Sequence, residues 1–270
     1  MRDANGNILA EIAAVTRGDV ERQKQFLPPD EIRRLCAAHG RAKRDFCAAL
    51  RRPGRGGPAA GRPRVIAELK KASPSAGVIR CDFQPLALAP RLEAAGAAAL
   101  SVLTEPHWFQ GSPAYVSEVS RLSSVPVLRK DFVVDAYQIY QAELWGADAV
   151  LLIAAMLDAV TLREFARVAA GLGLAVLGEA HDAAELDALL AVPEIGAVGV
   201  NCRDLKTFKT DWEGLDALLR QIPGERVAVA ESGIKSAADM EELPADAFLV
   251  GTTLMAAPDP AAALRGLLRP

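Results

Sequence analysis

The 270-residue chain is long for one domain, but some α/β folds routinely reach this length as a single domain, so we expect one core. Hydrophobic residues make up 51% of the chain and aromatic residues only 5%, which indicates a core of Ala, Leu and Val, as in helix-rich α/β proteins. The formal net charge of −3 gives no general attraction to nucleic acid or to an acidic membrane, so neither is expected as a partner.

The cysteines and the first residues bear on the cellular compartment. No two cysteines form a CxxC pair, and a chain of this size does not need disulfides, so we expect a reducing, cytoplasmic setting. Charged residues interrupt the first 20 positions, which argues against a signal peptide, and no run of 18 apolar residues predicts a membrane span. The four cysteines are Cys36, Cys47, Cys81 and Cys202.

Residues 1–50 carry a helical pattern throughout. Apolar residues recur at helical spacing from Ile8 to Val15, and a second segment follows the start signal Pro28-Pro29-Asp30. Residues 51–63 contain four Gly, three Pro and four Arg, which excludes a regular element and predicts a linker or exposed loop. An RNA-binding arm is the alternative, but no aromatic residues interleave with the arginines, so a solvated loop is preferred.

From Arg64 onward, short apolar runs alternate with amphipathic helical stretches, which predicts strands joined by crossover helices and therefore parallel pairing. Eight such units favour a closed (β/α)₈ TIM barrel, because a barrel leaves no edge strand. We expect one domain over residues 1–270, of which 1–63 is a helical extension and linker. The predicted strands cover residues 65–69, 98–103, 126–130, 148–153, 174–179, 195–201, 226–232 and 246–251.

An open, doubly wound parallel sheet is the alternative architecture. A dinucleotide-binding sheet of that kind would need G-x-G-x-x-G after its first strand, where this chain reads KKASPSAG. The barrel is therefore preferred.

Polar residues gather where the predicted strands end, and this is where barrel enzymes carry their catalytic side chains. Ionisable or amide groups arrive there from five strands, and a charge beside an apolar strand must be paired or used. Two alternatives stay open: Glu68 and Lys70 could be a structural ion pair, and Lys130 could be a rim lysine whose stem covers apolar surface. The residues are Glu68, Lys70, Lys130, Glu179, Asn201, Glu231 and Ser232, followed by Gly251 and Thr252 after the last strand.

The last two predicted strands end in a pattern typical of phosphate binding. Ser232 and Gly233, with a helix beginning near Ser236, offer a hydroxyl and backbone N–H groups. Gly251 and Thr252 repeat the arrangement one strand later. Because phosphate sites after the seventh and eighth strands are frequent in this fold, we expect a phosphorylated small-molecule substrate.

Other chemistries find less support in the sequence. His39, His107 and His181 lie in the extension, in a loop and at a helix start, without ligand spacing, so no metal is expected. No Ser/His/Asp set falls on strand ends. Cys202 lacks a histidine partner and is interpreted as a small buried residue.

Seven segments, in this order and spacing, resemble the motifs of indole-3-glycerol phosphate synthases, which are (β/α)₈ enzymes of tryptophan biosynthesis. They are IAELKKASPS, SVLTEPHWFQGS, LRKDF, GADAVLLI, VNCRDL, VAESGI and LVGTTLM, and the resemblance covers about residues 6–268. It implies a carboxy-lyase that closes the ring of 1-(2-carboxyphenylamino)-1-deoxyribulose 5-phosphate to give indole-3-glycerol phosphate, with loss of CO₂ and water and without cofactor or metal.

The resemblance also implies roles. Lys130 matches the general acid that protonates the C2′ carbonyl, and Glu179 matches the acid/base of the later dehydration, with Lys70 as an alternative acid. We expect burial and nearby cations to lower the pKa of such a lysine so that it can donate its proton. The implied catalytic residues are Lys130, Glu179, Lys70, Glu68, Asn201 and Ser232, and the implied substrate-binding residues are Ser73, Phe109, Phe132, Leu151, Arg203, Glu231, Gly233, Gly251 and Thr252.

Two alternative functions remain. Phosphoribosylanthranilate isomerases would need a Cys at the end of the first strand, where this chain has Glu68-Leu69-Lys70. A non-catalytic or divergent phosphosugar-binding barrel should have lost a catalytic group, and none is missing. In the stretch VPVLRKDF, we expect Lys130 to point into the barrel mouth, Arg129 outward to the helices, and Asp131 to fix the loop. A monomer or weak homo-oligomer is expected.

Overall fold

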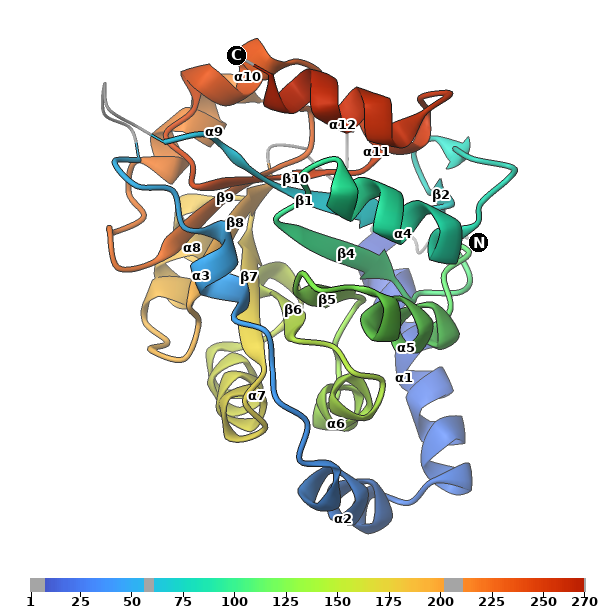
Figure 1. The fold of residues 1–270 in the computed structure, drawn as a ribbon. Helices are drawn as coiled ribbons and strands as arrows, with labels where there is room; N and C mark the ends of the chain where they lie inside the picture. The colour runs from blue at the N-terminus through green and yellow to red at the C-terminus, as the bar shows by residue number, and fades with distance from the viewer. Residues whose placement is uncertain (1–7, 56–60, 202–210, 270) are drawn as a thin grey trace.

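The computed structural model describes residues 8–55, 61–201 and 211–269. Eight parallel strands close into a barrel in which β1 pairs with both β4 and β10 (Figure 1). The predicted (β/α)₈ barrel with an N-terminal helical extension is confirmed, and every predicted strand lies close to its predicted bounds. The strands are β1 (Arg64–Leu69), β4 (Ala99–Leu103), β5 (Val127–Lys130), β6 (Ala149–Ile153), β7 (Ala175–Ala180), β8 (Ala197–Asn201), β9 (Val227–Glu231) and β10 (Ala247–Val250).

Helices follow the strands and cover the outside of the barrel. Several begin at a side-chain cap; the Asp158 carboxylate, for example, accepts hydrogen bonds from the N–H groups of Val160 and Thr161. No helix in the described part of the chain is long and apolar enough to cross a membrane. The helices are α4 (Pro85–Ala94), α5 (Pro113–Leu122), α6 (Ala136–Leu144), α7 (Ala159–Gly171), α8 (Ala183–Leu190), α9 (Trp212–Leu219), α10 (Ala237–Glu242), α11 (Thr252–Met255) and α12 (Pro260–Leu268), with a 3₁₀ turn, η1 (Ala154–Met156), after β6.

Side chains alternate between the barrel interior and the helix layer, as β5 illustrates. Leu128 belongs to the interior cluster, so Lys130, two residues later, also points inward. Arg129 points outward, where its guanidinium carbon lies 4.3 Å from the centroid of the Trp145 ring. Asp131 accepts a hydrogen bond from the Phe132 N–H at 2.8 Å and pairs with Arg129 at 2.7 Å. The three predicted orientations are therefore confirmed.

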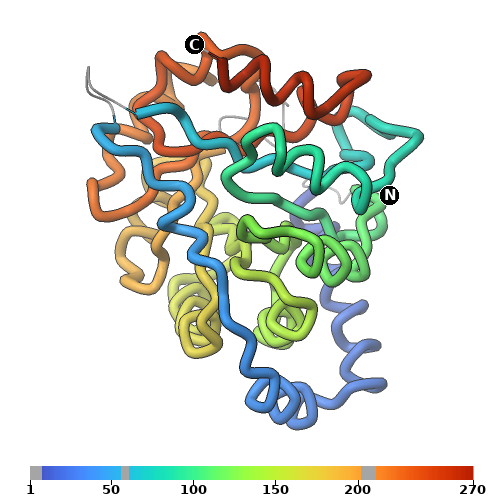
Figure 2. The backbone as a smooth tube through the Cα atoms, viewed as in Figure 1, coloured from blue at the N-terminus to red at the C-terminus, as the bar shows by residue number. Residues whose placement is uncertain are grey.

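The N-terminal extension forms α1 (Ile8–Phe26), α2 (Pro29–His39) and α3 (Phe46–Leu50). The prediction of helix throughout residues 1–50 is wrong for residues 40–45, because Gly40 adopts a left-handed conformation (φ 53°) and ends α2. Figure 2 traces this segment along the outside of the barrel from α2 to α3. Phe46 and Leu50 of α3 are fully buried against the interior cluster and close the amino end of the barrel.

The arginine-rich loop differs from the predicted solvated loop. Residues 51–55 and 61–63 form no helix or strand, as predicted, but Arg51, Arg52 and Arg55 are anchored on the barrel. Arg51 donates to the carbonyl oxygens of Gly224 and Glu225, and Arg55 pairs with Asp246 at 2.8 Å. Arg52 is buried. The reason is that backbone carbonyls and one buried carboxylate at the amino end of the barrel need donors.

A short hairpin after β1 was not predicted. β2 (Ala72–Ser73) and β3 (Gly77–Val78) pair antiparallel around a tight turn in which Gly77 has a φ of 63°. Two-residue strands carry too few side chains to show a period of two, so the sequence pattern could not reveal them. The hairpin places Ser73 at the barrel mouth.

Candidate active site

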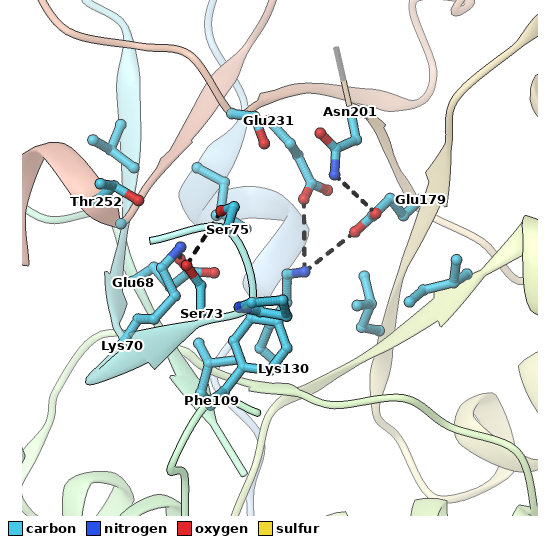
Figure 3. Close-up of a pocket in the computed structure, with 18 of the residues that line it drawn as sticks. Glu68, Lys70, Ser73, Ser75, Phe109, Lys130, Glu179, Asn201, Glu231 and Thr252 are labelled. Carbon is cyan, nitrogen blue, oxygen red and sulfur yellow. Dashed lines mark hydrogen bonds and ion pairs between the residues drawn. The ribbon is translucent and has the colours of Figure 1, made fainter. Parts of the chain in front are cut away.

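A pocket opens at the carboxyl ends of the barrel strands, where the sequence predicts that polar side chains gather (Figure 3). It contains Glu68 from β1, Lys130 from β5, Glu179 from β7 and Glu231 from β9. These are alternate strands of the barrel, and alternate strands contribute the four side chains of one interior layer in this fold. Barrel closure therefore brings together four ionisable groups that are far apart in the sequence.

Lys130 lies at the centre of this cluster. Its Nζ is 3.2 Å from Glu179 Oε2 and 3.9 Å from Glu231 Oε2. Asn201, at the end of β8, donates from Nδ2 to Glu179 Oε1 at 3.1 Å. Because the ammonium faces two buried carboxylates inside the pocket, the alternative of a rim lysine reaching for solvent is wrong.

Two carboxylates share one ammonium, and their pKa values move apart. Burial alone would raise the pKa of Glu179, but the charge of Lys130 outweighs it, with help from His181 and Asn201, and lowers the pKa to about 2. Burial and the nearby Glu179 charge raise the pKa of Glu231 well above its usual range. The pair therefore favours a charge on Glu179 and a proton on Glu231.

The expected lowering of the lysine pKa is wrong for this pocket. Burial does oppose the charge on Lys130, but Glu179, Glu231 and Glu68 outweigh it and raise its pKa above the usual value. The neighbours are carboxylates rather than cations. Lys130 is therefore held as an ammonium, and it can release its proton more readily when a bound molecule or a proton cancels the negative charge around it.

Glu68 and Lys70, both at the end of β1, form an ion pair. Both side chains line the pocket, so the same two residues form a structural ion pair and belong to the candidate site. Gly251, just after β10, leaves room for this pair: a Cβ there would collide with the Glu68 carboxylate and lie 2.9 Å from Lys70 Nζ. Only a glycine at this position lets β10 approach the ion pair so closely.

One wall of the pocket is apolar, as predicted for Phe109, Phe132 and Leu151. The centroids of the two phenylalanine rings are 5.8 Å apart. The loop that carries Phe109 is held by the buried Glu105 carboxylate, which accepts hydrogen bonds from three successive backbone N–H groups, those of His107, Trp108 and Phe109, at 2.7–3.0 Å. Sequence reasoning did not assign Glu105 this positioning role.

The first helix also reaches the pocket. Ile8, Leu9 and Ile12 of α1 are among the residues that line it. Their helical spacing was recognised in the sequence, but nothing local connects the N-terminal helix with a pocket built by residues 68–253. The N-terminal extension thus supplies part of the apolar lining.

The opposite rim is built by the loops after β9 and β10. Ser232 and Gly233 both have positive φ angles, 67° and 76°, and for a serine this conformation is strained. Thr253 Oγ1 donates to the Ile234 carbonyl at 2.5 Å and ties the two loops together. Ser232, Gly233, Gly251 and Thr252 all line the pocket, as does Lys235, which sequence reasoning missed.

Two predicted residues remain to be placed. Ser73 lies in β2 and lines the pocket, where its Oγ accepts a hydrogen bond from the Ala76 N–H at 3.3 Å. Arg203, like Cys202, lies outside the described residues. Within the described ranges, no group of three His, Cys, Asp or Glu side chains is arranged to hold a metal ion.

A family comparison covers nearly the whole chain. The family model described as indole-3-glycerol phosphate synthase matches residues 9–267. The chain belongs to this family. Curated relatives named indole-3-glycerol phosphate synthase include that of Azoarcus sp. strain BH72, 47% identical over 97% of this chain and 98% of its own length. The relative from Burkholderia vietnamiensis is 46% identical over 96% of this chain and 97% of its own length. The family predicted from the motifs is confirmed.

More distant solved structures share the fold of this family member. KGPDC from Streptococcus mutans aligns with a TM-score of 0.58 at 13% identity, over 76% of this chain and 95% of its own. Thiamine phosphate pyrophosphorylase from Pyrococcus furiosus aligns with a TM-score of 0.52 at 14% identity, over 76% and 93%. At such identities the likeness concerns the barrel alone.

His181 is a further neighbour of the cluster in this family member. It follows β7 directly, and its Nε2 lies 3.4 Å from Glu179 Oε1. The sequence pattern does not support His181 as a metal ligand, because ligand spacing is lacking, and it assigns His181 no other role. The available signal was its place two residues after Glu179, on the same face of the strand end.

Proposed function

We propose that this chain is an indole-3-glycerol phosphate synthase, which converts 1-(2-carboxyphenylamino)-1-deoxyribulose 5-phosphate to indole-3-glycerol phosphate, CO₂ and water. Family membership over nearly the whole chain supports the reaction class. The single observation that carries the mechanism is the Lys130 ammonium, held 3.2 Å from Glu179 between an apolar wall and a rim of serine, threonine and glycine.

The substrate has three chemically distinct parts, and the pocket offers a matching surface for each. The anthranilate ring would lie against Phe109, Phe132 and Leu151, and its carboxylate would meet Ser73. The phosphate would accept hydrogen bonds along the opposite rim, from Ser232, Gly233, Gly251 and Thr252. Such a pose holds the reacting ring carbon against the C2′ carbonyl, and orientation of this kind supplies a large part of catalysis.

Lys130 would donate its proton to the C2′ oxygen as the ring carbon attacks. A general acid of this kind typically contributes ~10²–10⁴-fold, and protonation makes the carbonyl electrophilic without a metal or cofactor. CO₂ then leaves from the ring carbon, and its bonding electrons restore the aromatic ring. Binding of the substrate excludes water, which strengthens the charges inside the pocket.

Dehydration needs one base and one acid. Glu179, whose pKa is lowered to about 2, enters the reaction ionised and would take the proton from C1′. Lys70, held by Glu68 on the other side of the pocket, would protonate the departing hydroxyl. Asn201 fixes the Glu179 carboxylate through its hydrogen bond, and Glu231 completes the charge environment of Lys130.

Lys130→Met tests the proposal most directly. We expect the purified wild type to form the fluorescent indole product and the variant to lose ~10²–10⁴-fold in kcat, because the methionine keeps the stem but has no proton. The matched control is Lys24→Met in α1, which removes an ion pair with Asp135 away from the pocket. No product from the wild type, or equal rates for both variants, contradicts the proposal; substrate binding without turnover would favour a divergent phosphosugar-binding barrel.

The proposal takes the chain to be one cytoplasmic domain that works as a monomer or weak homo-oligomer. Light scattering at assay concentration measures the mass in solution, and calorimetry tests whether the extension and barrel unfold together. Two separated unfolding transitions would contradict a single domain.

A further inference from the structure

His181 joins the buried Glu179 to the protein surface. Its Nε2 lies 3.4 Å from Glu179 Oε1, and its Nδ1 lies 3.2 Å from Glu185 Oε2, in the first turn of α8. The side chains become more exposed along this row, from 3% for Glu179 to 16% for His181 and 21% for Glu185. An imidazole with a carboxylate at each nitrogen is best satisfied when both nitrogens carry a proton.

The contacts of His181 favour its charged form but leave Nε2 poorly bonded. The Nε2 atom is buried and makes no hydrogen bond to any described residue. Its 3.4 Å distance to Glu179 Oε1 is an ion-pair contact without hydrogen-bond geometry. Burial opposes the charge, but Glu185 and Glu179 outweigh it and raise the pKa of His181, while Lys130 of β5 acts in the opposite direction. The groups that face the ring therefore come from β7, α8 and β5.

The proposed reaction consumes one proton per turnover. The substrate carboxylate leaves as CO₂, which releases no proton. The carbonyl oxygen leaves as water and takes up two protons, of which C1′ returns one. The second proton must come from solvent, yet a bound substrate fills the pocket mouth and excludes water from the cluster.

We propose that His181 stores this proton and delivers it through Glu179, as a positioning residue that does not itself touch the substrate. This inference rests on the proposed function. Once Lys130 has given its proton to the carbonyl oxygen, Glu179 loses its main counter-charge and becomes a better proton acceptor. The Nε2–H of the imidazolium moves to Glu179 Oε1. The carboxyl group then turns, so that this proton reaches the Lys130 amine, which lies 3.2 Å from Oε2.

Glu185 keeps the ring in the correct state during this transfer. Its carboxylate accepts the His181 backbone N–H at 2.8 Å and faces Nδ1 at 3.2 Å. After the transfer the neutral ring keeps its proton on Nδ1, so Nε2 remains the nitrogen that gives and takes the proton. When the product leaves and the pocket opens, Nε2 takes a proton from solvent. Glu179 releases the C1′ proton to solvent and Lys70 takes one up, which completes the cycle with one proton consumed.

His181→Gln separates proton storage from packing. The glutamine can place an amide N–H near the position of Nε2 and keeps the backbone bond to Glu185, but it cannot hold or release a proton. We expect kcat to fall about 10-fold, less than for loss of a direct donor, with KM changed by less than about twofold. We also expect a basic limb in the wild-type pH profile, where His181 loses its proton, and its absence in the variant.

Glu185→Gln and His39→Gln complete the design. Loss of the Glu185 charge lowers the pKa of His181, so the basic limb moves to lower pH, and the same shift appears in an NMR titration of the His181 ring without substrate. His39 lies on α2, 3.2 Å from Glu143, and its replacement leaves kcat and the basic limb unchanged.

The outcomes distinguish the two proposals. If the wild type forms no indole product, the proposed function fails, and the role of His181 fails with it. If the wild type turns over and His181→Gln keeps both kcat and the basic limb, only the proton store is overturned. If kcat falls in His181→Gln but the wild type shows no basic limb and its ring titrates normally, His181 is a packing residue and the proton store is also overturned.

Discussion

The two ends of the barrel both bury charges, but they balance them differently. At the amino end, Asp148 is fully buried and pairs with Arg41 at 2.9 Å and Arg44 at 2.8 Å. At the carboxyl end, the single ammonium of Lys130 faces two carboxylates, Glu179 and Glu231. The amino end gives one carboxylate two arginines, whereas at the carboxyl end the one ammonium of Lys130 lies between two carboxyl groups and can balance the charge of only one.

This difference separates a scaffold from a reactive site. At the amino end the Asp148 oxygens also accept the backbone N–H groups of Arg44 and Val127, so the carboxylate is fully hydrogen-bonded. At the carboxyl end the imbalance moves the pKa values of Glu179 and Glu231 in opposite directions. Buried charge alone is thus a poor guide to function, whereas buried charge that drives pKa values apart is a better one.

Removing one partner at the amino end should have the largest effect on stability. Asp148→Asn keeps the side-chain shape but loses the charge between two arginines and turns an amide N–H₂ toward donors. We expect a loss of about 3–5 kcal/mol in the free energy of unfolding, as for other buried pairs broken on one side. The kcat of the folded protein should stay close to that of the wild type, because the pocket is at the other end.

Urea unfolding measures the first effect, and Asp216→Asn is its control. Asp216 pairs with Arg220 on the exposed face of α9, and such pairs contribute only about 0–1 kcal/mol. Equal losses for the two variants would mean that the amino-end network does not stabilise the barrel.

At the carboxyl end, one added methyl group at Gly251 should lower the activity more than the stability of the fold. Gly251→Ala places a Cβ against the Glu68 carboxylate and 2.9 Å from Lys70 Nζ, so the ion pair must shift. Overpacking of this kind costs about 1–3 kcal/mol, and we expect part of it to appear as a lower kcat/KM. Gly224→Ala is the control, since its Cβ would meet nothing within 4 Å. Equal kinetics for both variants would show that the Glu68–Lys70 geometry is not needed.

The same contrast explains which features the sequence could reveal. The eight strands can be recognised as apolar runs between helical stretches. The charges at their ends are also visible in the sequence, as Glu68, Lys130, Glu179 and Glu231. Their mutual distances are not visible, because they depend on the closure of alternate strands into one layer. That is why the pKa of Lys130 was predicted in the wrong direction.

Other misses share this physical origin. The sequence predicts that Arg52 and Arg55 are solvated, because acceptors such as Asp246 lie nearly 200 positions away in the chain. His181 carries a local signal, because Glu179 lies two residues before it and Glu185 four residues after it, but this pattern matches no metal motif. Carboxylates on both sides of a histidine at a strand end are the signal that points to it.

Glu231→Gln should give a small, pH-dependent gain in the free energy of unfolding, which tests the charge balance at the carboxyl end of the barrel. Because burial and the Glu179 charge raise the pKa of Glu231, the folded protein keeps a proton that the unfolded chain releases near its ordinary pKa of 4.5. The folded state therefore binds more protons than the unfolded state above that pH, and stability falls as the pH rises through this window. Glutamine carries no such proton, so the variant lacks this fall.

The measurement is the free energy of unfolding in urea between pH 3 and pH 8. We expect the Glu231→Gln curve to rise above the wild-type curve once the pH exceeds about 4.5, with the difference growing until the folded wild type also ionises. Glu241→Gln, on the exposed face of α10, should run parallel to the wild type. Parallel curves for Glu231→Gln would mean that Glu231 is ionised in the folded protein, and that Lys130 balances two charges as well as the arginines balance Asp148.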